Sequence, residues 1–167
     1  MSNNNAAVWI KKLGLLPHPE GGYYKETYRS AVSSKFEGFE SIRDVSTGIY
    51  FMLTKGNFSA FHKIKSDEMW HFYDGDPVSI FVIDEFDTLK EIKLGLNIDK
   101  DELPQALVPA NCWFASSLIS GGVYALVGCT VSPGFDFKDF ELAKRDMLLQ
   151  AYPQYEKLIM NYTRREN

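Results

Sequence analysis

The chain has 167 residues, with 18 lysines and arginines against 22 aspartates and glutamates, which gives a formal charge of −4. This length suits one compact domain with a substantial core, and the interspersed charges form no basic stripe that would bind nucleic acid. No stretch has the length of a membrane span or the pattern of a secretory signal, so we expect a cytoplasmic protein without a membrane partner. Cys112 and Cys129 lack the spacing of a metal clip and the number of a disulfide framework, so we expect reduced, buried thiols.

The first part of the chain predicts a short helix followed by an irregular segment. The helix should cover residues 6–13 and end at Gly14, because glycine commonly terminates helices. Two prolines and two glycines interrupt residues 15–22, so neither a helix nor a strand is expected there.

From residue 23 to residue 131 the sequence predicts strands. Short runs of β-branched and aromatic residues alternate there with turn residues. The turns are tight, and the crossover helices that parallel neighbours would need are absent from the pattern, so the strands should pair antiparallel in a jelly-roll sandwich or barrel. The expected strands are residues 23–30, 45–53, 58–64, 68–73, 78–84, 89–94, 105–108, 112–118 and 123–131.

The last part of the chain changes to the 3.6-residue period of a helix. One apolar stripe of the expected helix is made by Phe140, Ala143, Met147 and Leu148. Asp139 is available as its cap, and a second short helix should begin at Pro153. We expect these C-terminal helices over about residues 139–161, packed on the outside of the sheet, so that residues 1–167 form a single domain.

One hairpin, residues 56–75, carries the side chains best suited to chemistry. Its two strands are joined by a polar turn at residues 65–67, which brings His62 and Glu68 to the same end of the hairpin. An imidazole and a carboxylate on a rigid sheet suit two roles, namely two ligands of a metal centre or a base with its orienting partner.

This hairpin resembles the first motif of the cupin superfamily, in which Gly, His, His, Glu and Gly follow one another at fixed spacings. Gly56, His62, Glu68 and Gly75 fall on that spacing, whereas Ile64 stands at the position of the second histidine. The resemblance implies a metal site whose ligands include the histidines and the glutamate, and this chain lacks one of those histidines.

The second cupin motif is echoed at residues 109–114. Asn111 replaces its glycine, which a left-handed turn tolerates, and Phe114 replaces its histidine. Two of the four metal ligands that the resemblance implies are therefore missing.

The chain is more similar still to one subgroup of the superfamily, Cupin_5 (DUF985), whose function is unknown. The similarity covers nearly the whole length, and the resemblance implies the double-stranded β-helix of the RmlC-like jelly rolls and a homodimer. The aromatic edge segment at residues 23–28 is compatible with strand exchange or addition between protomers. The matching blocks are His18-Pro-Glu-Gly-Gly22, Ser59-Ala-Phe-His62, Asp67-Glu-Met-Trp-His-Phe-Tyr-Asp-Gly75, Val108-Pro-Ala110 and Phe140-Glu-Leu-Ala143.

The missing ligands weigh against a tight catalytic metal, because a stable site needs at least three protein ligands. His62 and Glu68 supply two. Alternation along a regular strand puts His71 on the face opposite Glu68, so His71 could be a third ligand only if a bulge at residue 67 or 68 turned it inward. We therefore expect no cofactor, with a divalent metal held by His62 and Glu68 as the alternative.

The favoured interpretation is a metal-free, largely apolar cavity that binds a small molecule. The catalytic candidates are His62, Glu68 and His71. Glu20, in a loop that could close over the cavity, and Arg29, with its fork of donors, are ligand-binding candidates. The remaining ligand-binding candidates are aromatic side chains expected in the walls, namely Tyr50, Trp70, Phe72 and Phe114.

Three functions fit these residues. The first is a metal-independent isomerase or epimerase acting on a carbohydrate-like or other polar metabolite. Some cupins of similar shape are sugar-nucleotide epimerases that use a His base and a Tyr acid, an arrangement that His62 could form with Tyr50 or Tyr73. The second is a metal-dependent oxygenase or decarboxylase, and the third is a non-catalytic binding or storage-like module.

Overall fold

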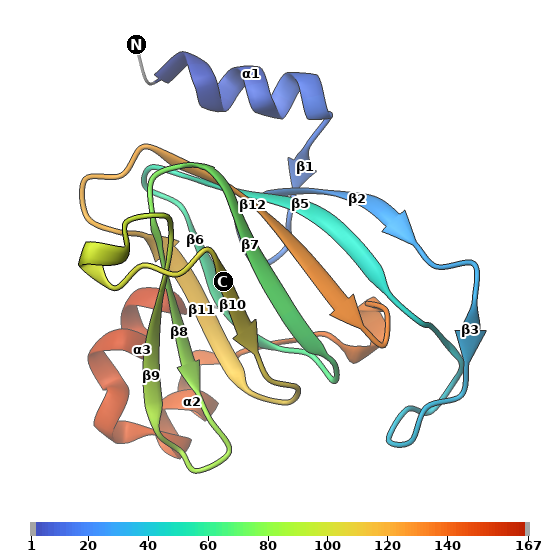
Figure 1. The fold of residues 1–167 in the computed structure, drawn as a ribbon. Coiled ribbons are helices and arrows are strands. Elements are labelled where there is room, and N and C mark those ends of the chain that lie inside the picture. Colours follow the sequence, from blue (N-terminus) through green and yellow to red (C-terminus); the bar gives the residue numbers. More distant parts are fainter. Residues whose placement is uncertain (1–2, 166–167) are drawn as a thin grey trace.

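Two antiparallel sheets face each other in the computed structural model, which describes residues 3–165 (Figure 1). The six-stranded sheet has the order β1-β2-β5-β12-β7-β10, with the bounds Leu16–Pro17, Tyr23–Arg29, Thr47–Thr54, Tyr124–Ser132, Asp67–Gly75 and Gln105–Val108. The five-stranded sheet has the order β13-β6-β11-β8-β9, with the bounds Glu141–Leu142, Phe58–Lys63, Trp113–Leu118, Val78–Ile83 and Leu89–Leu94. A separate small ladder pairs β3 (Ser33–Ser34) with β4 (Arg43–Asp44).

The sheet region agrees with the expectation of an all-β fold with antiparallel pairing. Each long strand between residues 23 and 132 lies within about two residues of its predicted bounds, which is the ordinary disagreement between assignments. The central pairs are extensive, and β12 runs between β5 and β7 along most of its length. The short two-residue strands β1, β3, β4 and β13 have no counterpart in the prediction.

The core between the sheets follows from alternation along each strand. In β5, Phe51 faces the other sheet, whereas the next residue, Met52, faces the opposite side. Trp70 of β7 and Phe114 of β11 meet Phe51 in this inner core, and all three are almost completely buried. The sandwich therefore has one inner core and two further apolar clusters on its outer faces.

Helix α1 (Asn3–Leu13) covers one end of the outer face of the six-stranded sheet (Figure 1). It ends at Gly14, which has the positive φ of 64° that glycine adopts without strain, as predicted. The indole N–H of Trp9 donates to Asp74 over 2.9 Å and fixes the helix to β7. Among residues 3–165, no helix is long and apolar enough to cross a membrane.

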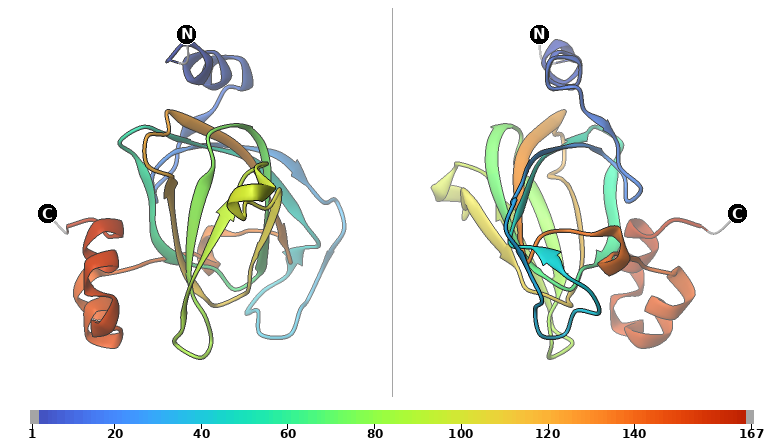
Figure 2. Two further views of the ribbon diagram at one scale, coloured as in Figure 1. Left: turned by 60° about the vertical axis from the view of Figure 1, so that its left-hand side comes forward. Right: turned by 90° about the vertical axis from the view of Figure 1, so that its right-hand side faces the viewer.

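The C-terminal helices, α2 (Arg145–Ala151) and α3 (Glu156–Tyr162), pack on the outer face of the five-stranded sheet, as expected (Figure 2). Leu148 and Ile159 are buried there against β6 and β11. Residues 3–165 also contain three single-turn helices, namely Ile98–Lys100, Phe137–Asp139 and Pro153–Tyr155.

The prediction of a helix from residue 139 was wrong in its first part. Residues 141–142 form strand β13 because the edge of β6 offers them backbone partners, and the N–H of Ala143 donates to the carbonyl of Phe61 over 2.8 Å. Phe140 therefore lines a cavity instead of a helix stripe, and Met147 is 58% exposed. Asp139 caps no α-helix and instead binds a buried arginine, as described below.

Candidate functional site

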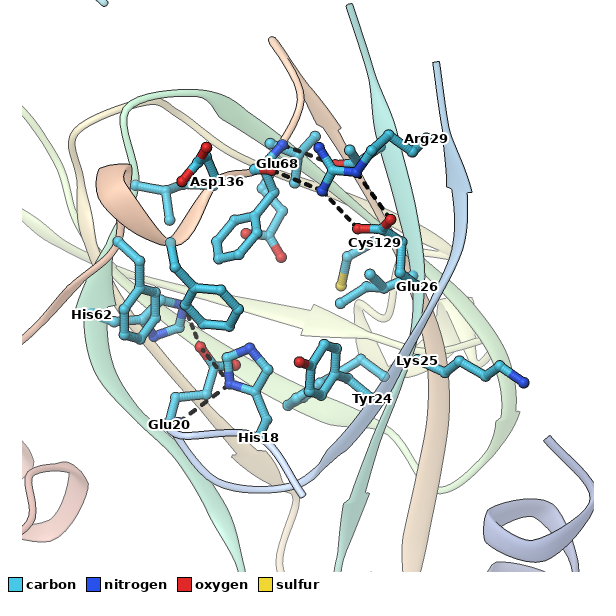
Figure 3. A pocket seen from close by; sticks show the side chains of 18 of the residues that line it. His18, Glu20, Tyr24, Lys25, Glu26, Arg29, His62, Glu68, Cys129 and Asp136 are labelled. Carbon is cyan, nitrogen blue, oxygen red and sulfur yellow. Dashed lines mark hydrogen bonds and ion pairs between the residues drawn. The ribbon is translucent and has the colours of Figure 1, made fainter. Parts of the chain in front are cut away.

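A cavity of about 580 Å³ lies at one end of the sandwich (Figure 3). Strands of the six-stranded sheet and β6 of the other sheet form its walls, while residues 14–20 and 135–140 complete it. This volume is typical of small-molecule sites. The buried polar side chains in its lining are Glu20, Thr47, His62 and Glu68, with His18 beside them.

The loop after β1 brings two of these polar side chains into the cavity. Gly21 and Gly22 have φ angles of 115° and 76°, so the chain can turn back within a few residues. The N–H of His18 donates to the carbonyl of Gly22 over 3.0 Å, which closes the turn. The carbonyl of Glu20 accepts from Ala60 of β6 over 2.8 Å, and this bond holds the loop beside His62.

His62 uses both ring nitrogens in protein contacts. Its Nδ1 lies 2.7 Å from the carbonyl oxygen of Ala60, an acceptor, so Nδ1 carries a proton. Its Nε2 lies 2.9 Å from Oε2 of Glu20, and both side chains are buried. Burial lowers the pKa of His62, but the charge and hydrogen bond of Glu20, together with the charge of Glu68 and the Ala60 carbonyl, more than reverse this and leave it raised.

The partner of His62 is an ionised carboxylate. Burial raises the pKa of Glu20, but the nearby charge and hydrogen bond of His62 outweigh burial and leave it lowered. The two groups therefore form a buried imidazolium–carboxylate pair. Because both of its nitrogens carry protons, His62 has no lone pair to offer a ligand and cannot act as a base in this state.

His18 is a neutral imidazole that faces the cavity (Figure 3). The N–H of Glu20 donates to its Nδ1 over 3.2 Å, so the ring proton sits on Nε2. Burial lowers the pKa of His18 by more than the charge of Glu20 raises it. Within residues 3–165 the Nε2 atom has no hydrogen-bond partner, so this N–H can donate to a ligand.

Glu68 is a buried carboxyl group without a counter-ion. No lysine, arginine or histidine nitrogen of the described residues lies within 4.0 Å of its oxygens. Burial raises its pKa to about 7; the charge of His62 opposes this shift and that of Glu20 adds to it. The Cys129 thiol and the Trp70 indole favour the ionised form weakly. Glu68 is therefore populated in both protonation states near neutral pH.

Aromatic side chains from one segment close the side of the cavity. We call residues 135–140 the aromatic strap, because it runs from the end of β12 to β13 and places Phe135, Phe137 and Phe140 in the lining. The ring of Phe140 lies 5.4 Å from that of His62, and Phe137 stacks on His18 at 6.0 Å. The strap therefore packs directly against both histidines.

A buried ion pair anchors the aromatic strap. Arg43 donates to both carboxylate oxygens of Asp139, over 2.6 Å from Nε and 2.9 Å from Nη2, and only 5% and 6% of the two side chains are exposed. Such a bidentate contact fixes orientation as well as distance. At the other end of the strap, the N–H of Phe135 donates to the hydroxyl of Thr47 over 2.9 Å.

The cavity mouth carries charged side chains that are bound to one another. Arg29 donates to both carboxylate oxygens of Glu26, to Asp44 over 2.8 Å and to the carbonyl of Phe135. The hydrogen bonds to Glu26 and Asp44 raise the pKa of Arg29 further above its usual range. Arg29 lies in the lining, and four of its five N–H groups already have partners, so its role in ligand binding stays a prediction.

Comparison with known proteins identifies the family. A family model described as "Cupin superfamily (DUF985)" matches residues 7–143. The chain belongs to this family. The uncharacterized protein YML079W of Saccharomyces cerevisiae is 30% identical to this cupin over 143 residues, which cover 78% of this chain and 71% of the yeast protein.

Two solved structures match this cupin over almost its whole length. A hypothetical protein from Leishmania major is 38% identical, with a TM-score of 0.90 over 96% of this chain and 99% of its own. The protein SO0799 from Shewanella oneidensis is 41% identical, with a TM-score of 0.87 over 96% and 98% of the two chains.

A more distant match supports the jelly-roll fold alone. Oxalate decarboxylase from Bacillus subtilis is 14% identical, and the match covers 90% of this chain but 37% of the decarboxylase, with a TM-score of 0.56. This likeness shows that the present protein has the cupin fold. It does not show the same chemistry, because one fold can host many activities.

The residues of this cupin do not fit the metal centre that its superfamily implies. Ile64 and Phe114 have only carbon atoms at two ligand positions, and both nitrogens of His62 are already engaged. Among residues 3–165, no group of three or more His, Cys, Asp or Glu side chains is arranged to hold a metal ion. We therefore derive no step through a metal.

Five of the candidate residues line the cavity. His62, Glu68, Trp70, Glu20 and Arg29 all reach it, as expected from the hairpin, the flexible loop and strand alternation. The hairpin brings His62 and Glu68 into one cavity, but the direct partner of His62 is Glu20. Their roles toward a ligand stay predictions.

Three residues that the sequence placed at the site lie instead on the outer face of the six-stranded sheet, namely His71, Tyr50 and Tyr73. His71 contacts Thr130 and Gln105, because the register of β7 is regular from residue 68 to 71 and its bulge comes too late to turn this side chain inward. Tyr50 packs in the cluster beneath α1, and its ring lies 6.2 Å from that of Tyr73. The proposed pairing of His62 with Tyr50 or Tyr73 is therefore not formed.

Phe114 and Phe72 are core residues and not cavity walls. Phe114 lies opposite His62 in the ladder between β11 and β6, and its ring centroid is 4.0 Å from that of His62. It is 1% exposed, so it supports the imidazole from behind. Phe72 packs against the inner core outside the lining.

Sequence reasoning missed His18, Tyr24 and the aromatic strap. His18 stands in the block His18-Pro-Glu-Gly-Gly22, and its two-residue spacing from Glu20 before two glycines was a usable signal. The sequence prediction used only Phe140 of the strap, which it assigned to a helix stripe, and it gave Phe135 and Phe137 no role.

Replacing Glu20 by Gln should destabilise the protein by about 2 kcal/mol at pH 7, because a charge-assisted hydrogen bond is lost and His62 must give up its charge. The contribution of Glu20 to stability is lost as pH falls through its lowered pKa, and that of His62 is lost as pH rises through its raised pKa. Urea denaturation from pH 4 to pH 9 measures both limits. The matched control is His71→Gln on the outer face, which should change stability by less than about 0.5 kcal/mol. A Glu20→Gln variant as stable as the native protein at pH 7 would contradict the ion pair.

Replacing Glu68 by Gln should stabilise the protein at alkaline pH. The folded protein holds the Glu68 proton up to about pH 7, whereas the unfolded chain releases it near 4.5, so native stability falls with rising pH between these values. Above pH 7 the variant should gain up to about 3 kcal/mol relative to the native protein, and much less at pH 4. Urea denaturation at the two pH values measures the difference. An unchanged difference between pH 4 and pH 8 would show that Glu68 titrates normally.

Proposed function

We propose that this protein binds a small carbonyl-bearing metabolite in the cavity and catalyses a metal-independent proton transfer, as an isomerase or epimerase does. The observation that carries the proposal is that Glu68, a carboxyl populated in both protonation states, and His18, a neutral imidazole with a free N–H, face the same enclosed space. An acid–base catalyst works best when its pKa is close to the working pH.

Glu68 is the proposed base. In its ionised form it takes a proton from the carbon next to the carbonyl group, and the electron pair of that C–H bond moves toward the carbonyl oxygen. In its protonated form it returns the proton to the same or the neighbouring carbon. The atoms balance without an oxidant or a reductant, so the reaction needs no further reactant.

His18 is the proposed hydrogen-bond donor to the carbonyl oxygen. Its Nδ1 is occupied by the N–H of Glu20, and burial keeps the ring neutral, so Nε2–H is the group available to the developing negative charge. A fixed donor in a buried site stabilises such a charge more than water does. Phe137 and Tyr24, which pack on the His18 ring, hold its orientation.

The Glu20–His62 pair has a positioning role in this proposal. Glu20 carries the backbone N–H that sets the tautomer of His18, and His62 holds the Glu20 side chain in place through its Nε2. The positive charge of His62 also limits the rise in the Glu68 pKa. The apolar walls, including Phe51 and Trp70, exclude water from the reacting groups.

Solvent isotope exchange tests this function without knowledge of the natural substrate. Aldoses, ketoses, sugar nucleotides, 2-keto acids and amino ketones are incubated with the protein in D₂O, and deuterium at the carbon next to the carbonyl is followed by NMR. We expect exchange on at least one compound. It should fall by about a factor of 100 or more in Glu68→Gln and His18→Phe and persist in His71→Gln.

Two results would contradict the proposal. Exchange on none of these classes would favour a non-catalytic binding module. Exchange that a chelator abolishes and a divalent metal restores would favour the metal-dependent alternative, because the proposed proton transfer uses only groups of the protein.

We also propose that the protein is a homodimer. Strand β1 pairs only with residues 23 and 24 of β2, so among the described residues the rest of that edge, residues 25–29, has no strand partner. An open edge of this kind can pair with the same edge of a second copy.

Light scattering of the protein at micromolar concentration tests the dimer. We expect a mass close to twice the 19.1 kDa of one chain. A mass of one chain at that concentration would contradict the pairing of these edges.

The cytoplasmic location stays part of the proposal. Cys112 and Cys129 are both free and buried, which suits a compartment that keeps thiols reduced. A small-metabolite enzyme would find its substrates there.

A further inference from the structure

The charges that line the cavity are unevenly matched. Four carboxylates, those of Glu20, Glu26, Glu68 and Asp136, stand in the lining. The cations near them are largely satisfied, because His62 is bound to Glu20, and Arg29 is bound to Glu26 and Asp44. Figure 3 shows the side chain of Lys25 directed away from the hollow.

Of the two buried carboxyl groups in the lining, Glu20 is paired with His62, whereas Glu68 has no counter-ion among residues 3–165. It is 8% exposed, and its oxygens have no cationic nitrogen within 4.0 Å among residues 3–165. A buried carboxylate without a cation is unfavourable in the ionised form. A ligand that brings a positive charge would relieve this cost, whereas an anionic ligand would increase it.

The walls around Glu68 are suited to the same charge. Aromatic faces attract cations through their negative π-surfaces, most strongly where water is excluded. Trp70 lies next to the Glu68 carboxyl, and the aromatic strap supplies further rings. The aromatic residues of the lining are Tyr24, Phe51, Trp70, Phe135, Phe137 and Phe140.

From these observations we infer that the cavity binds an organic cation, with a substituted ammonium group held between the Glu68 carboxylate and the aromatic walls. Phosphate-bearing ligands such as sugar nucleotides fit poorly, because no unpaired cation faces the interior from residues 3–165. The inference rests on the proposed function for the place of the site. It deepens that function by naming the charge of the ligand that the site takes.

Three matched probes test the charge preference by isothermal titration calorimetry at pH 8. Choline carries the ammonium group, 3,3-dimethylbutan-1-ol is its neutral carbon isostere, and 3,3-dimethylbutanoate is an anion of similar size. We expect the native protein to bind choline at least about tenfold more tightly than the neutral alcohol, and the anion most weakly.

The variants assign the preference to Glu68. Glu68→Gln should reduce the preference for choline over the alcohol to about threefold or less, whereas Glu68→Asp, which keeps the charge, should retain most of it. The matched control is Glu85→Gln, because Glu85 is an exposed carboxylate in the β8–β9 turn and outside the lining. It should leave the preference unchanged. Thermal unfolding of each variant confirms that it is folded.

Proton release gives a second readout that needs no variant. At pH 7 choline should displace part of the Glu68 proton, seen as a binding enthalpy that differs between two buffers of different ionisation enthalpy. The other titratable groups that face Glu68 are Glu20 and His18 of the loop, His62 of β6 and Cys129 of β12. Glu20 and His62 are ionised, and His18 and Cys129 are neutral. A cation next to Glu68 should not reverse these protonation states.

The outcomes separate this inference from the proposed function. Equal binding of choline and the alcohol, tighter binding of the anion, or no binding of choline would overturn the inference. If isotope exchange still depended on Glu68, the proposed function would stand without it. Cation-selective binding that depends on Glu68, together with no exchange on any carbonyl compound, would support the inference and overturn the catalytic proposal.

Discussion

The buried pair between Glu20 and His62 is the interaction on which the site depends. It joins a loop that precedes the first long strand to the hairpin that carries Glu68. The pair occupies Nε2 of His62, and the carbonyl of Ala60 occupies Nδ1, so the charge of this imidazolium is already neutralised by Glu20. The pKa of Glu68 is therefore set mainly by burial and not by a counter-ion. In a cupin with histidines at positions 64 and 114, the histidine at position 62 would be expected to bind a metal instead.

Other contacts in the cavity are consistent with an ionised Glu20–His62 pair and a Glu68 without a counter-ion. The backbone of Glu20 fixes the proton of His18 on Nε2, so one loop residue sets the state of both histidines. The aromatic strap covers them, and its own position depends on the buried contact between Arg43 and Asp139. Two ion pairs in different parts of the chain therefore shape a cavity in which Glu68 is a buried carboxyl group without a counter-ion among the described residues.

Strand alternation predicted much of the site, because it is a local property of the chain. It placed Glu68 and Trp70 inside and His71 outside, and the turn at residues 65–67 brought His62 to the same end. It could not choose the partner of His62, since Glu20 approaches through tertiary packing of a glycine turn against β6. Phe140 was misread because a helix stripe and a loop that folds over a cavity leave similar apolar spacing. Tyr50 was misplaced because both faces of β5 are apolar, one toward the core and one toward α1.

Nitrogen-15 NMR of the imidazole side chains tests the proton arrangement most directly, and the chain has only three histidines to assign. At pH 7.5 the account predicts that both nitrogens of His62 are protonated and that His18 is neutral with its proton on Nε2. The half-buried ring of His71 on the outer face of the sheet, outside the cavity, serves as the internal reference. A neutral His62 with one bare nitrogen, or a His18 protonated on Nδ1, would contradict the account.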